Sequence, residues 1–308
     1  MKETFFSPAD ILLPPYTPDD PAWCKWSVIA CDQFTSEKQY WDSVAKITEG
    51  APSAYSLILP EAYLGSEAEE VHKKTIAASM DTVGTFLKKY ENVMVYVERT
   101  LEGAGVRRGL VGKLDLEKYD YSASSISPVR ATEATVLERI PPRCRIRASS
   151  PFELPHVMVF ADDKGGIISS LASRKNEMKK LYDFDLMLGG GHITAYLVDG
   201  EILRALLCNI ADYEAEKSGS VVYAMGKVRK LVRRNIPCRV CGRRRQPLPC
   251  RGKGALGECP CIRLPRGEIR TLRDRGHLRA FNRIRADLPH CEELQCSRFP
   301  FGARSALR

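Results

Sequence analysis

The chain has 308 residues, 44% of them hydrophobic, which is long enough to bury a sizeable core in one large domain or two smaller ones. No apolar run approaches the roughly 18 residues that cross a bilayer, so no membrane-spanning helix is expected. The opening stretch MKETFFSPADILLPP lacks a basic region followed by an apolar one, and we therefore expect a cytoplasmic protein without a membrane partner.

Charge and cysteine content change abruptly at Gly226. Residues 227–308 contain 22 basic and six acidic side chains, a net charge of +16, whereas residues 1–226 carry a net charge of −7. Seven of the 11 cysteines also follow Gly226, and the other four are isolated, as is usual for free thiols in a reducing compartment. We therefore predict a folded unit over 1–226 and a largely irregular tail, rich in Arg, Cys and Pro, over 227–308.

Four segments of the first unit have helical periodicity. Residues 35–47 carry an apolar stripe after a Thr-Ser-Glu start. Residues 66–90 begin at a capping Ser66 followed by glutamates and end with Lys88 and Lys89, which matches the helix dipole. Residues 169–187 and 201–219 are predicted to form two further helices.

Strand signals alternate with these helices. Residues 54–60 form an apolar run closed by Pro60. Four further segments are rich in β-branched residues and alternate in polarity, namely 93–100, 108–116, 156–163 and 193–200. Mixed strands and helices with short connections predict an α/β fold in the broad sense, with an α+β arrangement of a mixed sheet and flanking helices.

The densest polar stretch is SPVRATEATVLERIPPRCRIR at 127–147. Guanidinium groups offer forked donors to phosphate or carboxylate, so Arg130, Arg139 and Arg143 with the Thr132 hydroxyl predict an anion-binding clamp. Glu133 lies within it as a candidate catalytic carboxylate. The alternative is a charged pair of strands on a solvated face, and composition alone favours that alternative.

A second candidate is LMLGGGHITAYLV at 186–198, where three glycines precede His192. Backbone N–H groups of a glycine loop can hold phosphate, which makes His192 a candidate phosphate-binding or acid/base group. The stretch matches neither a P-loop nor a dinucleotide-binding fingerprint, and a plain turn with a structural histidine is the preferred interpretation. Asp32, directly after the apolar SVIAC, is a further candidate catalytic carboxylate, whereas Asp162-Asp163 favours a turn over a Mg²⁺ site.

Several blocks of the chain resemble, in order, those of one bacterial family, the domain-of-unknown-function family DUF-1015. They are WSVIACDQFTSEKQYW (26–41), SLILPEAYL (56–64), VERTLEGAGVRRGLVGKLDLEKYDY (97–121), RATEATVLERIPPR (130–143) and LYDFDLMLGGGHITAYLV (181–198). The resemblance covers about residues 5–226, with Ala134 and Ala195 at positions where the family blocks have glycine.

The resemblance implies a distant similarity to the ParB/sulfiredoxin-like group, which includes nucleotide-using proteins and free-serine kinases. That group carries a phosphate-binding glycine–histidine turn after a strand similar to VVYAMG at 221–226, but here KVRKLVRR follows instead. We therefore expect a truncated family member with little or no phosphotransferase activity. Intact relatives would use nucleotide with Mg²⁺ and a carboxylate such as Asp32 or Glu133. The alternative is a non-catalytic module that binds a nucleotide or metabolite.

Three hypotheses account for the tail. Out-of-frame translation is favoured, because 19 Arg stand against three Lys and the family resemblance stops at Gly226. A zinc module is the second, with a set of thiolates at Cys238, Cys241, Cys250 and Cys259. The third is an arm that binds nucleic acid non-specifically through its basic residues.

Overall fold

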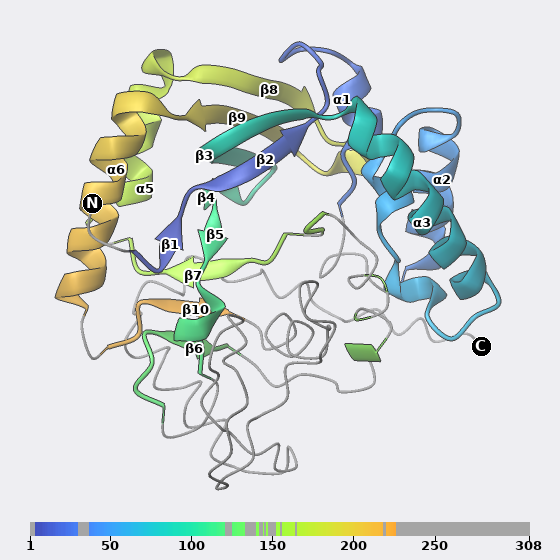
Figure 1. Cartoon of the computed structure of the whole chain (residues 1–308). Helices are drawn as coiled ribbons and strands as arrows, with labels where there is room; N and C mark the ends of the chain where they lie inside the picture. Colours follow the sequence, from blue (N-terminus) through green and yellow to red (C-terminus); the bar gives the residue numbers. More distant parts are fainter. Residues whose placement is uncertain are drawn as a thin grey trace, which may run out of the picture.

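A five-stranded antiparallel sheet, here called the larger sheet, organises the fold (Figure 1). The structure is a computed structural model that describes residues 4–29, 37–120, 125–132, 140–141, 144, 146, 152–154, 156–163, 165–217 and 220–225. The long strand β3 (Lys88–Leu101) has partners on both sides. On one side, its first part pairs with β2 (Ala9–Leu13) and its second part pairs with β4 (Gly105–Val111). On the other side it pairs with β9 (His192–Val198), which pairs in turn with β8 (Lys179–Asp185).

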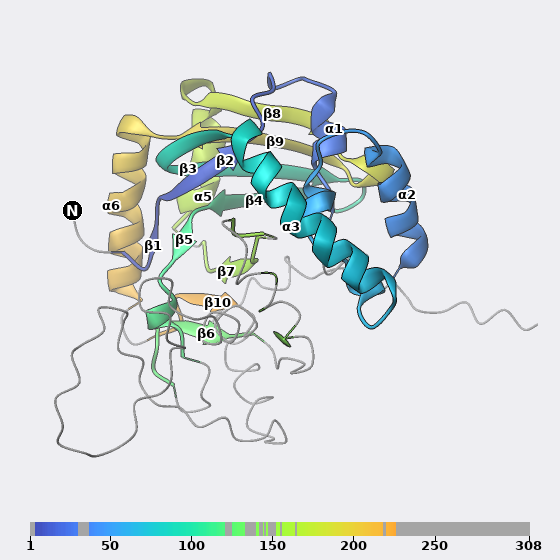
Figure 2. The ribbon, with the colours of Figure 1, turned by 45° about the vertical axis from the view of Figure 1, so that its right-hand side comes forward.

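A smaller sheet of three short strands lies below the larger one in both views (Figures 1 and 2). Its middle strand β10 (Tyr223–Met225) runs parallel to β6 (Val129–Ala131) and antiparallel to β7 (Val159–Ala161). A two-residue pairing of β1 (Phe6–Ser7) with β5 (Lys113–Leu114) lies between the two sheets (Figure 1). The last described strand is therefore held between two segments that lie far upstream in the sequence.

Helices lie at both ends of the larger sheet (Figure 2). At one end are α6 (Gly200–Glu216) and α5 (Ile167–Leu171), which continues into the 3₁₀ helix η5 (Ala172–Glu177). At the other end are α1 (Ala22–Trp26), α2 (Lys38–Thr48) and α3 (Ala68–Phe86). Short 3₁₀ turns complete the described elements, namely η1 (Ala54–Leu57), η2 (Glu61–Tyr63), η3 (Leu116–Lys118) and η6 (Met187–Gly189).

Aromatic packing fixes α1 and α2 against the end of the larger sheet. Trp23 and Trp41 are fully buried, and the Trp23 ring stacks on Phe184 of β8 with 5.8 Å between ring centroids. At the other end, Met94, Tyr96 and Val198 form a cluster with the apolar face of α6. Burial of such side chains contributes about 1.5–3 kcal/mol each, so both ends of the sheet are anchored by apolar packing.

The structure confirms the α+β class and most of the predicted elements. The predicted helices at 35–47 and 201–219 correspond to α2 and α6, and the strands at 93–100 and 193–200 correspond to β3 and β9. The strand predicted over 108–116 is divided into β4 and β5, and that over 156–163 is reduced to β7. Among the described residues, no helix is both long enough and apolar enough to span a bilayer.

One element prediction was wrong, and two helices were predicted to extend too far. Residues 54–60 begin as the 3₁₀ helix η1 instead of a strand, because the Ser53 hydroxyl accepts a hydrogen bond from the Tyr55 amide and starts a turn. The helix predicted over 66–90 spans Ala68–Phe86, and the chain from Lys88 pairs with β2 instead. The helix predicted over 169–187 ends at Glu177, and the following residues form β8 against β9. In the last two cases, sheet pairing overrides local helix propensity.

Candidate functional site

The carboxyl-terminal half of β3 presents different chemistry on its two faces. Successive side chains of a strand point to opposite sides, and directly paired residues share a side. Glu98 is paired with Arg108 and Thr194, so these side chains share what we call the Glu98 face. Arg99 is paired with Arg107 and Ile193, and these share the Arg99 face.

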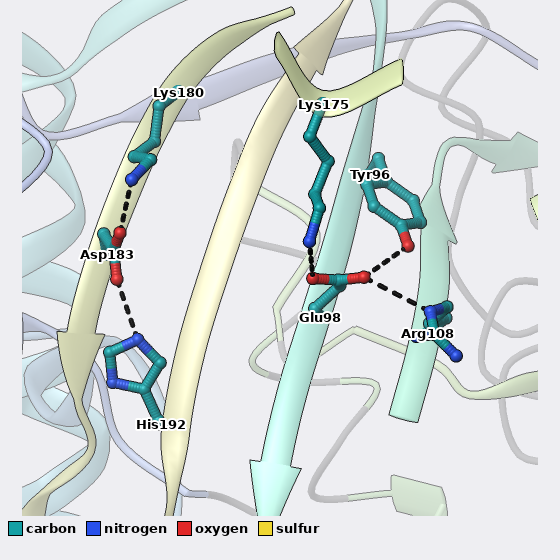
Figure 3. A network of polar contacts seen from close by, with 7 residues as sticks. All are labelled: Tyr96, Glu98, Arg108, Lys175, Lys180, Asp183 and His192. Atoms are coloured by element: carbon teal, nitrogen blue, oxygen red, sulfur yellow. Dashed lines mark hydrogen bonds and ion pairs between the residues drawn. The ribbon is translucent and has the colours of Figure 1, made fainter. Parts of the chain in front are cut away.

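On the Glu98 face, three donors surround one carboxylate (Figure 3). Glu98 accepts hydrogen bonds from the Tyr96 hydroxyl at 2.8 Å, Lys175 Nζ at 2.8 Å and Arg108 Nε at 3.2 Å. Burial favours the neutral acid, but the bonds from Lys175 and Tyr96 outweigh it, and the pKa of Glu98 lies below its usual value. The carboxylate therefore remains charged and satisfied, which is the behaviour of a structural group.

A second cluster on the Glu98 face surrounds His192 (Figure 3). The ring nitrogen Nδ1 lies 2.8 Å from Asp185 Oδ1, and Nε2 lies 2.7 Å from Asp183 Oδ1. Lys180 Nζ contacts the other oxygen of Asp183 at 2.5 Å. The hydrogen bond to Asp185 is the main cause that raises the pKa of His192; burial opposes it, and Asp183 adds to the rise. His192 thus favours the imidazolium form.

The Arg99 face carries two arginines directly opposite each other. Within the described part of the chain, neither Arg99 nor Arg107 forms an ion pair with a carboxylate. Arg99 donates from Nε at 3.0 Å and from Nη2 at 2.7 Å to a single acceptor, the carbonyl oxygen of Gly190. Its pKa is lowered first by burial and then by the charge of Arg107. Two facing like charges destabilise a sheet unless an anion joins them.

A glycine turn connects β8 to β9 and supplies the Gly190 carbonyl. Leu188, Gly189 and Gly191 all have positive φ, at 55°, 70° and 85°. A Cβ atom on Gly191 would lie 2.2 Å from the carbonyl oxygen of Thr100, so the turn lies directly against the end of β3. Only glycine permits this approach. The turn thus fixes the Arg99 guanidinium near the end of β3.

Of the sequence-predicted site residues, three lie within the described part. Arg130 is on β6 of the smaller sheet, where its Nε donates to the Ser127 carbonyl at 3.0 Å, and the Thr132 amide donates to the Met225 carbonyl. His192 is on β9 of the larger sheet, between two carboxylates. The remaining candidates lie outside the described residues, namely Asp32, Glu133, Arg139, Arg143, Cys238, Cys241, Cys250 and Cys259.

The turn prediction for Asp162-Asp163 is confirmed. The Asp163 carbonyl accepts a hydrogen bond from the Gly166 amide at 2.8 Å, which closes the turn. Its carboxylate accepts hydrogen bonds from the Ile168 and Ser169 amides in the first turn of α5. Asp162 is buried and lies 3.0 Å from Lys217 Nζ. Among the described residues, no group of three His, Cys, Asp or Glu side chains is arranged to hold a metal ion.

Comparison with known proteins bears on this geometry. Residues 15–215 match the family described as "Protein of unknown function (DUF1015)". The chain belongs to this family. No curated protein and no solved structure matches it. The DUF1015 match confirms the resemblance noted in the sequence, and it includes Arg99, Arg107, the glycine turn and His192.

Sequence reasoning missed the arginine pair of this DUF1015 chain. The available signal was the hairpin VERTLEGAGVRRGLV at 97–111, whose glycine-containing turn sets the register. That register places Arg99 opposite Arg107 and Glu98 opposite Arg108. The first pair is a like-charge mismatch and the second an ordinary ion pair, so counting outwards from the turn would have identified the unusual one.

Proposed function

We propose that this chain binds a small molecule that carries a phosphate or another compact dianionic group, through Arg99 and Arg107. The observation that carries the proposal is a pair of arginines directly opposite each other in the strand register, neither of which has a carboxylate partner in the described residues. The guanidinium of one of them, Arg99, is held by the Gly190 carbonyl. An anion between them would relieve both the desolvation of Arg99 and its repulsion from Arg107. With Nε and Nη2 bonded to the Gly190 carbonyl, Arg99 would present its remaining N–H groups to the anion from a fixed position.

The finer proposal is that the ligand is a nucleotide or a phosphorylated metabolite, bound without turnover. It rests on the resemblance to nucleotide-using proteins and on the sequence after Gly226, where the glycine–histidine phosphate turn is replaced by KVRKLVRR. Intact relatives would act as serine-type kinases with Mg²⁺, with Asp32 or Glu133 as the carboxylate. Phosphoryl transfer depends on positioning and charge stabilisation, so losing the turn would abolish the step while leaving the arginine pair.

We propose further that residues 1–226 form the functional unit, in the cytoplasm, and that residues 227–308 arise from a shifted reading frame. The loss of lysine, the excess of arginine and the end of the resemblance at Gly226 support this. Translation of the coding DNA in all three frames tests it. A neighbouring frame that encodes a glycine–histidine turn directly after Met225 is the expected result, and its absence would leave the zinc and nucleic-acid hypotheses for the tail.

Calorimetric titration with sulfate, inorganic phosphate and adenine nucleotides tests the binding proposal. Arg107→Gln should weaken sulfate binding at least about tenfold, because one charge-assisted contact is lost. The same variant should unfold at an equal or higher denaturant concentration than the wild type, because the like-charge contact is removed. The matched control is Arg204→Gln, an exposed arginine on α6. Equal affinity of wild type and Arg107→Gln would refute the proposal.

A further inference from the structure

His192 occupies the last register pair of β8 and β9 before the glycine turn. It is paired with Asp185, and the Leu186 amide donates to the Gly191 carbonyl at 2.8 Å just beyond that pair. The imidazole reaches both the directly opposite Asp185 and, two residues back along β8, Asp183. The ring therefore fastens β9 to β8 at the base of the turn.

Both contacts of the ring are with carboxylate oxygens, which only accept hydrogen bonds. A neutral imidazole has one N–H and one lone pair, so it can satisfy only one of the two carboxylates. The other nitrogen would then direct its lone pair at an oxygen 2.7–2.8 Å away. Two ionised carboxylates at hydrogen-bond distance from the two ring nitrogens therefore favour the imidazolium form.

Only one residue, Gly191, separates His192 from the carbonyl that holds Arg99. Gly191 lies against the Thr100 carbonyl, and Gly190 accepts both bonds from the Arg99 guanidinium. The His192 clamp is on the Glu98 face and the arginine is on the Arg99 face, joined through this turn. A change in the fastening at the base of the turn would move the Gly190 carbonyl, and with it the guanidinium.

We infer that His192 is a positioning residue for the anion site, an inference that rests on the proposed function. The protonated ring clamps β8 to β9 and thereby holds the Gly190 carbonyl on Arg99. Anion binding is in this way coupled to proton uptake. The ligand is the same dianionic group, and its binding is regulated by pH. The uncharged ring releases one carboxylate, loosens the turn and weakens the grip of Arg99 on the anion.

The charged groups around His192 indicate that the proton on His192 is the one gained or lost near neutral pH. From β8 it faces Asp183, which also contacts Lys180, and Asp185. On β3 the same face carries Glu98, whose oxygens are engaged by Lys175 of η5 and Arg108 of β4. The carboxylates Asp183 and Glu98 have lowered pKa values and stay ionised near neutral pH. The titrating member of the cluster in this range is therefore His192.

Sulfate affinity measured between about pH 5.5 and 8.5 tests the coupling, because sulfate stays a dianion throughout. The raised pKa of His192 means that the clamp is complete below the ordinary imidazole value of about 6.5 and is lost as pH rises through the higher folded value. Wild-type affinity should fall about fivefold or more across the range. His192→Gln should bind sulfate weakly at every pH, without this slope. Asp185→Asn should reduce the slope, and Asp81→Asn on α3 should leave it unchanged.

The outcomes separate the two proposals. Sulfate binding without a pH slope, or an equal slope in His192→Gln, overturns the clamp but leaves the anion site intact. Absence of sulfate binding at every pH overturns both. A second measurement serves if His192→Gln does not fold: the NMR titration of His192 in the wild type. Reciprocal linkage predicts that saturating sulfate raises the pKa of His192, and an unchanged value would overturn the coupling.

Discussion

Gly191 is the glycine of the turn that lies directly against the backbone of another strand. Its φ is 85°, and an added Cβ would meet the Thr100 carbonyl oxygen at 2.2 Å, a backbone atom within the larger sheet that cannot move aside. Gly189 in the same turn has a φ of 70° but nothing within 4 Å of the position of an added Cβ. A side chain at Gly189 would therefore add backbone strain alone, whereas a side chain at Gly191 would add both strain and a steric collision.

Gly189→Ala should lower the free energy of unfolding by about 1 kcal/mol, the usual cost of a left-handed alanine. Gly191→Ala should lower it by about 3 kcal/mol or more, since a backbone collision is added to that strain. Urea denaturation of both variants measures the difference. Gly191→Ala should also lose sulfate affinity, because the Gly190 carbonyl moves away from Arg99. Equal stability of the two variants would contradict the close contact with Thr100.

At the scale of elements, the helices with clear periodicity and the β-branched strands could be predicted from the sequence. Such elements bury a continuous apolar stripe, and the pattern of α2 and α6 records it directly. The end of α3 could not be predicted, since Lys88 and Lys89 suit a helix terminus as well as a strand. The deciding partner is distant: β2 pairs with this segment, and Asp10 of β2 lies 3.0 Å from Lys89.

The functional residues show the same division between local and distant information. The glycine turn was visible as GGGH, but its partner Arg99 lies 91 positions upstream of the carbonyl that it binds. Likewise, His192 was identified as a candidate phosphate-binding group, whereas its two carboxylate neighbours become evident only once β8 is known to be a strand. The predicted helix over 169–187 had hidden that pairing. Long-range sheet register, which no local pattern encodes, is therefore what builds the site.

At the scale of the whole molecule, one buried carboxylate joins the beginning of the described chain to its end. Glu214 on α6 is only 6% exposed. Its oxygens accept hydrogen bonds from the amides of Phe5 at 2.7 Å and Phe6 at 3.0 Å, and from the Tyr223 hydroxyl at 3.0 Å. Burial is the main cause that raises the pKa of Tyr223, and Glu214 adds to it, so the phenol remains a donor. This contact ties β1, α6 and β10 together.

Glu214→Gln is nearly isosteric but replaces one acceptor oxygen with a donor amide, which would face a backbone N–H or the Tyr223 hydroxyl. A buried donor left against another donor loses its bond and keeps its desolvation cost, so the variant should unfold with about 3 kcal/mol less free energy than the wild type. The control is Glu216→Gln, two residues further along α6. Because Glu216 is exposed, this change should cost less than about 0.5 kcal/mol. Reversible unfolding in urea, followed by far-ultraviolet circular dichroism, measures both.

Because Glu214 holds elements from both ends of residues 1–226, the loss of stability in Glu214→Gln should appear as a shift of one cooperative transition. A separate early transition would instead show that the smaller sheet and the N-terminal strand unfold independently of the larger sheet, and that residues 1–226 are not a single folding unit.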